Sequence, residues 1–339
     1  MKTTGSPVRV ALVGAGGITA EHVKGFVAHA DRIRCVAIAD PVESARRRRL
    51  DEYGKPCRGF ADWGAMLAAM GGEIDAVDIC LPHHLHAECI LAAAAAGKHI
   101  LCEKPMCTNL DDADRIGRAV AESGITYMSA HNQLFLPAVV KAKEMLDAGT
   151  LGRVFWLRSQ DCFWANWGEG GNPFKGTWRE SRDTQGGGVL IDTGYHPTYR
   201  LLHLAGSNVT AVRGTMGRYR QTIEGEDTAS VQVRFDSGAI GEIFTSWAMP
   251  LPAGTHQIQV IGEKGQVYGS GDTLYHLPQG ETTPRQMKFD FVNTFTAEIG
   301  HFADCLMQGR RPIHGYEEGR AVLEVILAAT RDAERFAPL

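Results

Sequence analysis

The sequence lacks three features that would each define a class of protein: paired cysteines, a long apolar run and an excess of one charge. Its eight cysteines are scattered, without a C-x-x-C pair or a zinc-like quartet, so we expect reduced thiols rather than a disulfide framework. No apolar run approaches the roughly 20 residues that span a bilayer, and Val10 to Val13 is too short for a signal peptide. A formal charge of -4 disfavours nucleic acid and anionic membranes as partners. We therefore expect a cytoplasmic protein that binds neither.

The sequence does have enough chain for more than one hydrophobic core, with 339 residues of which 44% are hydrophobic. Up to about residue 130, short apolar strands alternate with helical stretches, which is typical of βαβ units and a doubly wound parallel sheet. Beyond residue 150, segments of alternating polarity are separated by turns such as DSG (236–238), which favours an antiparallel meander. The sequence therefore predicts an α/β domain over 1–130 and an α+β domain over 131–339, with helices near 187–204, 294–308 and 315–336.

A glycine-rich turn, VGAGGIT, links the first expected strand to the first expected helix. Gly14 and Gly16 let the backbone approach a pyrophosphate, and the helix N-terminus supplies N–H donors, although Thr19 stands where a third glycine is usual. Asp40 ends the next strand, and an acid there accepts hydrogen bonds from ribose hydroxyls and repels a 2′-phosphate. The arginines 46–49 could reach such a phosphate, but on a helix they point in all directions, so we expect most to be solvated. We prefer NAD over NADP; the alternative is a tight turn followed by a solvated aspartate.

The stretch HILCEKPMC changes abruptly from an apolar strand to charged residues. Ligands of a doubly wound sheet collect beyond the carboxyl ends of its strands, which is where Lys104 is expected. An ammonium group there could stabilise a developing alkoxide and relay its proton. Taken alone, Glu103 and Lys104 would more often be a solvated charge pair.

A second candidate group lies in GGGVLIDTGYHPTYRLLHLAG, residues 186–206. Asp192 and His196 are four residues apart and would share one face of a helix, with Tyr199 on the same stripe. A histidine of near-neutral pKa can take a proton from a hydroxyl while a carboxylate orients it. Pro197 predicts a kink beside His196. The alternative is a surface helix with a polar stripe.

Four stretches together resemble the Gfo/Idh/MocA family, the relatives of glucose–fructose oxidoreductase and inositol dehydrogenase: GKHILCEKP, the glycine turn ending in His22, DAVDICLPHHLHAECILAAAAAGKH, and WRESRDTQGGGVLIDTGYH. The likeness extends nearly from end to end. It implies a Rossmann domain, an α+β domain with a large open-faced, mainly antiparallel sheet, a nicotinamide cofactor, and a homodimer or homotetramer built on the sheet face. It also implies that Lys104, Asp192 and His196 form the catalytic group. Many relatives carry an acid where this chain has Tyr199, so we expect the substrate to be held differently.

Further candidates accompany these motifs. The residues predicted to contact the cofactor are Gly14, Gly16, Gly17, Ile18, Asp40, Pro82, His86, Glu103 and Lys104. The residues predicted to contact the substrate are Asn132, Trp164, Trp178, Arg179, Asp192, His196 and Tyr199. Indole faces, including that of Trp167, stack well on sugar rings, although tryptophans are more often core or interface residues. The cluster His83, His84 and His86 has no nearby acid or thiol arrangement, so we predict no metal.

The leading hypothesis is an NAD-dependent dehydrogenase acting on a secondary hydroxyl of a sugar, a glycoside (C3 of a pyranoside is one option) or a polyol. A reductase of a keto-sugar would use the same residues in the opposite direction. A non-catalytic dinucleotide sensor is the third hypothesis, but it would be expected to lack the lysine or the histidine, and both are present.

Overall fold

The computed structural model describes residues 6–165 and 173–335, which form two units. The first unit contains the residues up to Asn132 together with Asn293–Arg320, and the second contains Gln133–Val292 and the residues from Ala321 onward. The sequence predicts one boundary after residue 130, whereas in the structure the segment Asn293–Arg320 belongs to the first unit. A physical reason is the close contact of Gly25 with Ile299, where an added Cβ would lie 2.7 Å from Ile299 Cγ1.

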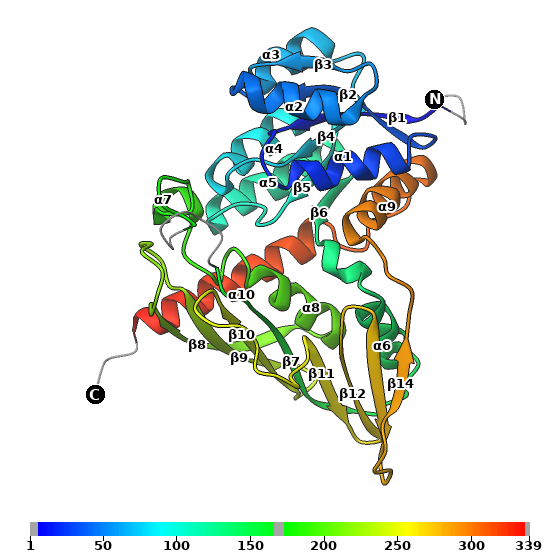
Figure 1. Cartoon of the computed structure of the whole chain (residues 1–339), viewed down its shortest axis with the longest axis vertical. Coiled ribbons are helices and arrows are strands. Elements are labelled where there is room, and N and C mark those ends of the chain that lie inside the picture. Colours follow the sequence, from blue (N-terminus) through cyan, green and yellow to red (C-terminus); the bar gives the residue numbers. More distant parts are fainter. Residues whose placement is uncertain (1–5, 166–172, 336–339) are drawn as a thin grey trace. The chain divides into compact units, whose positions relative to one another are not determined.

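The first unit is built on a sheet of six parallel strands in the order β3-β2-β1-β4-β5-β6, which confirms the predicted doubly wound α/β fold (Figure 1). Its strands are β1 (Val8–Val13), β2 (Ile33–Ala39), β3 (Arg58–Phe60), β4 (Ala76–Ile79), β5 (His99–Glu103) and β6 (Tyr127–Ala130). Its helices are α1 (Thr19–Ala28), α2 (Glu43–Tyr53), α3 (Trp63–Met70), α4 (His86–Ala95), α5 (Leu110–Ser123) and α9 (Thr294–Gln308), with short 3-10 turns at His83–Leu85 and Asn132–Phe135. Strand β4 is buried along its whole length, and β1 and β5 are buried except at their first residues, as apolar runs in a parallel sheet require.

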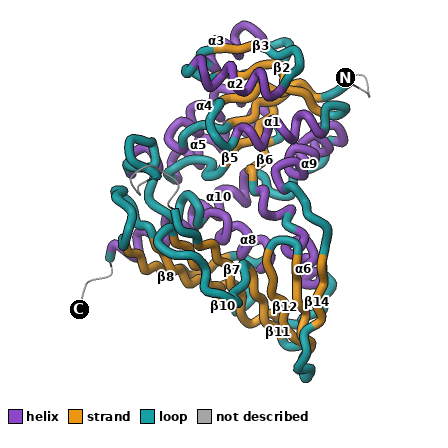
Figure 2. Tube along the Cα trace, in the orientation of Figure 1, coloured by secondary structure: helices purple, strands orange, loops and turns teal. Residues whose placement is uncertain are grey.

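The second unit is built on a sheet of eight strands in the order β14-β13-β12-β11-β7-β10-β9-β8 (Figure 2). Its strands are β7 (Val154–Cys162), β8 (Val209–Gly217), β9 (Thr228–Phe235), β10 (Ile240–Ser246), β11 (Ile258–Gly262), β12 (Gly265–Ser270), β13 (Thr273–Pro278) and β14 (Arg285–Lys288). The remaining helices are α6 (Pro137–Asp147), α7 (Arg182–Gln185), α8 (Tyr195–Ala205) and α10 (Tyr316–Glu334). The sheet is mainly antiparallel, as predicted, but it is not a simple meander, because β7 pairs with β10 in parallel and separates it from β11.

Helix α8 covers one face of this sheet. A Cβ added to Gly241 would lie 2.8 Å from a methyl carbon of Leu201, so the helix approaches the strands closely at that point. On the strands, Leu157 and Val233 are buried on the side of Gly241, to which both are paired. His196, the catalytic candidate on α8, therefore belongs to a helix that packs closely on the sheet.

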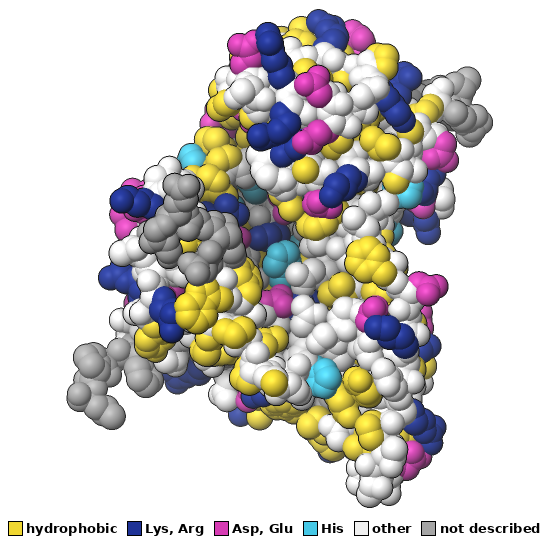
Figure 3. All heavy atoms as spheres, viewed as in Figure 1, with side chains coloured by type: hydrophobic (Ala, Val, Ile, Leu, Met, Phe, Trp, Pro, Cys, Tyr) yellow, Lys and Arg dark blue, Asp and Glu magenta, His cyan; other side chains and the backbone are white. Residues whose placement is uncertain are grey.

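Lys and Arg side chains lie next to Asp and Glu side chains over α2, α3 and their surroundings in the first unit (Figure 3). This interspersed pattern fits a net charge of only -4. Within residues 6–165 and 173–335, no helix combines the length and the apolar character needed to cross a bilayer.

Candidate functional site

The glycine turn joins β1 to α1 and is shaped by three different requirements. Gly14 has φ +97° and a Cβ there would lie 2.3 Å from the carbonyl oxygen of Cys80, so only glycine fits. At Gly16 and Gly17 an added Cβ would meet no atom within 4 Å, so the backbone faces open space immediately before the N-terminus of α1. Thr19, in the place of a third glycine, is buried and its hydroxyl donates to the Gly16 carbonyl at 3.1 Å. The turn thus fits a phosphate group, and the hydrogen bond of Thr19 stabilises its conformation.

Asp40 lies directly after β2 and beside this turn. Its carboxylate accepts the N–H of Ala15 at 2.7 Å through Oδ2 and the N–H of Val42 at 2.8 Å through Oδ1. Each oxygen retains capacity to accept a hydroxyl proton, so the residue fits an NAD ribose while it also fixes the turn. The exposed Ile18 is the N-cap residue that precedes α1.

The arginine-rich helix α2 is less uniformly solvated than predicted. Arg47 and Arg48 are exposed, but Arg49 is only 5% exposed and donates to the Gly16 carbonyl at 2.8 Å. The prediction of solvation is therefore wrong for Arg49, because its guanidinium satisfies a carbonyl of the glycine turn. Arg46 donates to the main-chain carbonyl of Asp40.

Lys104 follows β5 at the carboxyl edge of the parallel sheet and is partly buried. Glu103 before it is buried, and its two oxygens are divided between His22 Nε2 at 3.1 Å and the N–H of Lys104 at 3.1 Å. The alternative of a solvated charge pair therefore fails for Glu103. Burial alone would raise the pKa of Glu103, but the hydrogen bond and charge of His22 and the charge of Lys104 outweigh it, so the pKa is lowered.

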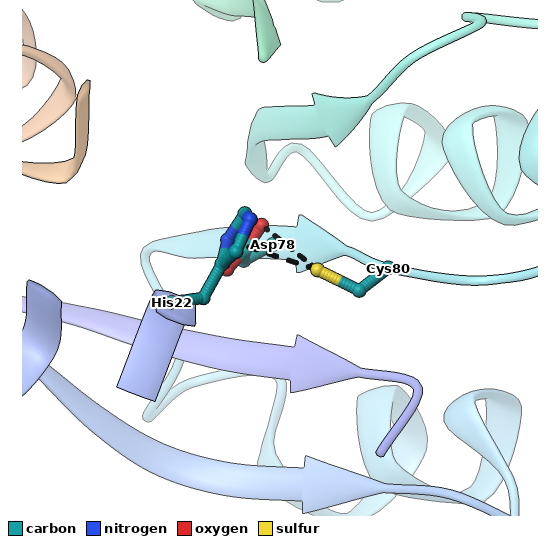
Figure 4. Close-up of side chains that lie close together, drawn as sticks. All are labelled: His22, Asp78 and Cys80. Atoms are coloured by element: carbon teal, nitrogen blue, oxygen red, sulfur yellow. Dashed lines mark hydrogen bonds and ion pairs between the residues drawn. The ribbon is translucent and has the colours of Figure 1, made fainter. Parts of the chain in front are cut away.

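His22, from the buried side of α1, forms the centre of a charged network inside the first unit. Its Nδ1 lies 2.8 Å from Asp78 Oδ2 on β4, and both side chains are completely buried. Figure 4 shows the imidazole directed toward Asp78 and toward Cys80, whose sulfur lies 3.7 Å from Nδ1. Burial opposes the charge on His22, but the charge of Asp78 outweighs it and raises the pKa well above its ordinary value.

His22, Asp78 and Cys80 could in principle hold a metal ion, since their ligand atoms lie within 4.8 Å of one another. To bind a metal ion, the histidine must have a ring nitrogen without a proton and the cysteine must be a thiolate. Here both ring nitrogens of His22 face carboxylates, and burial raises the pKa of the Cys80 thiol far above its usual range. The geometry therefore fits a hydrogen-bonded network better than a metal centre.

His86 and Pro82 lie at the end of β4, on the chain entering α4. His86 is completely buried, with Nδ1 2.6 Å from the Pro105 carbonyl and Nε2 2.8 Å from the Leu81 carbonyl. It thus fixes the backbone just after Lys104, while the partly exposed Pro82 precedes the short turn that carries His83. Burial lowers the pKa of His86.

Asn132 lies immediately after β6 and is buried. Its side-chain amide donates to the hydroxyl of Thr294, the first residue of α9, at 2.9 Å. This bond links the last strand of the sheet to the C-terminal segment of the same unit.

Asp192 is in a glycine-rich turn before α8, not on the helix as predicted, so the expected shared helical face with His196 is wrong. Gly188 explains the turn, because a Cβ there would lie 2.1 Å from the Glu226 carbonyl oxygen. The buried Glu226 carboxylate also accepts the N–H of Leu190 at 2.9 Å. Such backbone contacts across the sheet override the helical periodicity of the segment.

The carboxylate of Asp192 is 4% exposed and forms an ion pair with Arg179, at 2.6 Å from Arg179 Nε to Oδ2. Gln185 approaches the same oxygen at 3.4 Å. Arg179 thus lies next to this catalytic candidate.

His196 occupies the first turn of α8 and is partly exposed, whereas Tyr199, one turn later, is completely buried. The tyrosine hydroxyl lies 2.8 Å from His196 Nδ1 and accepts the N–H of Gln133 at 3.0 Å. Tyr199 therefore contacts the Nδ1 side of the imidazole from the buried side of the helix. Pro197 also lies in this first turn, where N–H groups have no intrahelical acceptor, so it does not interrupt the helix.

The predicted aromatic contacts are only partly described. Trp164 is 47% exposed, and the guanidinium of Arg220 lies 4.0 Å from its ring centre. Trp178 is partly buried beneath Arg179 at 4.1 Å. Both indoles already stack with cations, which adds polar groups beside apolar rings. Trp167 lies outside the described residues.

The structure brings the candidates together within each unit: the glycine turn with Asp40, Glu103 with Lys104, and Asp192 and His196 around the start of α8. The residues that sequence patterns did not single out are Asp78, Glu226 and Glu298. An acid inside an apolar strand or on the buried stripe of a helix is the signal that could have identified Asp78 and Glu298.

Comparison with known protein families gives two matches along the chain. Residues 8–131 match the model of the oxidoreductase family with an NAD-binding Rossmann fold, and residues 139–268 match the C-terminal domain model of GFO/IDH/MocA proteins. The chain is 28% identical to scyllo-inositol 2-dehydrogenase (NAD(+)) of Bacillus subtilis, over 98% of this chain and 96% of that protein. It is 30% identical to levoglucosan dehydrogenase of Pseudarthrobacter phenanthrenivorans, over 62% of this chain and 57% of that protein.

A solved structure of levoglucosan dehydrogenase in complex with NADH and levoglucosan has the same fold. The TM-score is 0.86 at 21% identity, and the match covers 97% of this chain and 98% of that one.

Proposed function

Because the chain belongs to the Gfo/Idh/MocA family of NAD(P)-dependent oxidoreductases, we propose that it oxidises a secondary hydroxyl of a sugar, glycoside or polyol with NAD. The observation that carries the choice of cofactor is the open glycine turn with Asp40 beside it. The backbone at Gly16 and Gly17 leaves space for the pyrophosphate, and the carboxylate favours a free ribose over a 2′-phosphate. The cofactor, when bound, accepts the hydride.

The chain's own residues supply the proton chemistry in this proposal. His196 takes the hydroxyl proton, and Asp192 orients the imidazole or anchors the substrate. Lys104 stabilises the oxygen as negative charge develops on it and relays the single hydroxyl proton to His196. Two features support these roles: His196 has Tyr199 at one ring nitrogen and a partly exposed ring, and Lys104 stands at the strand end where ligands of such sheets bind.

A carbohydrate-like substrate is supported by aromatic and cationic side chains of the second unit. Trp164 and Trp178 offer apolar faces for a sugar ring, and Arg179 offers donors for its hydroxyls. The proteins of related sequence include an inositol dehydrogenase and a levoglucosan dehydrogenase, both of which act on polyhydroxylated rings. Within this class, oxidation at C3 of a pyranoside remains the specific hypothesis, since an exposed indole suits a glycoside with an aglycone.

The test is an assay of reduced-nicotinamide absorbance with purified protein, NAD or NADP, and a panel of inositols, free sugars, anhydrosugars and aryl glycosides. We expect turnover with NAD for at least one member, and faster turnover with NAD than with NADP. The same panel of keto-sugars with reduced cofactor tests the reductase alternative. Cofactor binding without turnover in either direction would instead indicate a dinucleotide sensor.

We also propose a homo-oligomer formed through the face of the eight-stranded sheet opposite α8. Ile240, Trp156 and Ile261 are paired across three neighbouring strands and so share that face; Ile240 is 43% and Ile261 39% exposed. Replacing Ile261→Lys should dissociate the oligomer in sedimentation experiments, whereas Lys264→Glu in the adjoining turn should not. A wild-type protein that sediments as a monomer would refute this part.

A cytoplasmic location completes the proposal. All eight cysteines are free thiols, although Cys35 and Cys57 have sulfurs only 3.8 Å apart. Free neighbouring thiols fit a reducing compartment. Cell fractionation followed by immunodetection tests the location, and recovery outside the cytoplasm would contradict it.

A further inference from the structure

His22 is held between two acids that come from different strands. Its Nδ1 faces Asp78 of β4 at 2.8 Å, and its Nε2 faces Glu103 of β5 at 3.1 Å. Carboxylates only accept hydrogen bonds, so both contacts are satisfied together only when both ring nitrogens carry protons. His22 is therefore an imidazolium that joins α1, the helix of the glycine turn, to the strand that ends at Lys104.

The other groups around His22 do not replace this charge. Glu298 from α9 is completely buried and has no hydrogen-bond partner for either oxygen among the described residues. Burial, and then the charge of Glu103, raise its pKa well above the ordinary value, which favours the neutral acid. Phe295, also from α9, has its ring 5.9 Å from the imidazole, and Cys80 stays a neutral thiol. The His22 imidazolium is thus the cation that pairs with both buried carboxylates, Asp78 and Glu103.

The connection to the proposed chemistry passes through Glu103. One oxygen of this carboxylate accepts a hydrogen bond from Nε2 of His22, and the other accepts one from the backbone N–H of Lys104, each at 3.1 Å. The carboxylate is buried, so its orientation is set by these two bonds and not by water. We propose that His22 is a positioning residue that, through Glu103, fixes the backbone from which the Lys104 ammonium reaches the substrate; this inference rests on the role proposed above for Lys104.

Loss of the Nε2 bond should act on chemistry more than on binding. Without its charged partner, the Glu103 carboxylate is free to turn or to take up a proton, and the Lys104 N–H loses a fixed acceptor. A displacement of about 1 Å in a catalytic group can lower a rate roughly a hundredfold. The glycine turn is held by Thr19 and Asp40 instead, so cofactor affinity should change little.

Two substitutions at position 22 separate positioning from a merely structural role. In His22→Gln, the amide nitrogen reaches the place of Nε2 and keeps the bond to Glu103. In His22→Asn, the amide nitrogen takes the place of Nδ1 and keeps the bond to Asp78. Each variant retains one of two buried hydrogen bonds, so both should lose similar stability. We expect kcat of His22→Asn to be at least about tenfold below that of His22→Gln, with equal dissociation constants for NAD.

The deuterium isotope effect on kcat, measured with substrate labelled at the reacting carbon, should also be larger for His22→Asn, because hydride transfer becomes slower. Arg9→Gln is the stability control, since it breaks the Arg9–Asp75 ion pair in the same unit without contacting the network. If His22→Asn does not fold, Glu103→Ala removes the link to Lys104 while keeping the His22–Asp78 pair, and should show the same loss of kcat.

Equal kcat values for the two position-22 variants, or a Glu103→Ala variant with wild-type kcat, would overturn the inference. A Lys104→Met variant that retains activity would instead refute the proposed function. The two failures are therefore distinguishable.

Discussion

The two units hold their candidate residues by different means. In the first unit, Glu103 and Lys104 end a buried parallel strand, and charged side chains beneath the strand fix them. In the second unit, Asp192 lies in a turn shaped by glycine contacts, and His196 starts a helix, with neutral groups such as Tyr199 behind it. The first arrangement depends on a buried charged network, whereas the second combines the Asp192–Arg179 ion pair with close backbone packing in the glycine-rich turn. Variants in the first unit should therefore change charge stabilisation and cofactor choice, and variants in the second should change proton transfer.

The largest effect is expected at the strand end of the first unit. Lys104→Met keeps the length of the side chain and removes the ammonium, so kcat should fall about a thousandfold while NAD still binds. Steady-state kinetics and fluorescence titration with NAD measure the two quantities. Lys98→Met, one strand length earlier, is the matched control and should keep normal turnover. Normal turnover by Lys104→Met would show that Lys104 takes no part in catalysis.

A smaller effect is expected behind His196 in the second unit. Tyr199→Phe removes the hydroxyl from Nδ1 and an acceptor from the Gln133 N–H, so kcat should fall about tenfold. The pH profile of kcat/KM should shift as well, because the imidazole loses a hydrogen-bonding partner.

Tyr53 offers the matched control in the first unit, since its hydroxyl also accepts a buried backbone N–H, that of Cys35 at 3.0 Å. Tyr53→Phe should cost similar stability and leave the pH profile in place. Identical profiles for wild type and Tyr199→Phe would show that Tyr199 is only structural.

Cofactor preference should respond to the first unit alone. Asp40→Ser removes the charge that opposes a 2′-phosphate, so the ratio of kcat/KM for NADP over NAD should rise about tenfold. Glu43→Gln removes an exposed acid three residues away and should leave the ratio unchanged. A similar change in both variants would mean that general charge, rather than the ribose position, governs preference.

The smallest effect is one of stability. Glu298→Leu replaces a buried acid whose oxygens have no hydrogen-bond partner among the described residues, and it should raise the free energy of unfolding by about 1–3 kcal/mol. The pKa of Glu298 is raised in the folded state, so folding binds a proton above the unfolded value of 4.5 and wild-type stability declines as pH rises through this range.

The stabilisation by Leu should therefore be larger at about pH 8 than at about pH 5 in urea unfolding. Glu281→Gln, an exposed acid of the second unit, should change stability little at either pH. A gain that is equal at both values would show that Glu298 is ionised in the folded protein.

Local patterns predicted much of this architecture. The alternation of strands and helices predicted the parallel sheet, and the helices near 294–308 and 315–336 were predicted close to their observed bounds. The antiparallel segments were also predicted, since period-two polarity depends on neighbours in sequence. The parallel pairing of β7 with β10 was not, because strand order depends on contacts between distant segments.

The candidate site divides in the same way. The glycine turn, Asp40 and Lys104 follow from strand ends, which a local pattern reveals. The turn around Asp192 did not follow, because contacts of Gly188 with Glu226 replace the helix that the local sequence favours. The network of His22, Asp78 and Glu298 combines three distant segments, and no periodicity predicts that they meet.

The central proposal is that Lys104 and His196 act on the same substrate, and a double-mutant cycle with Lys104→Met and His196→Gln tests it most directly. If both side chains stabilise the same transition state, their effects should be strongly non-additive, and the double variant should be about as slow as the slower single variant. Losses in kcat/KM that multiply in the double variant would contradict the account, because they would mean that the lysine and the histidine act independently.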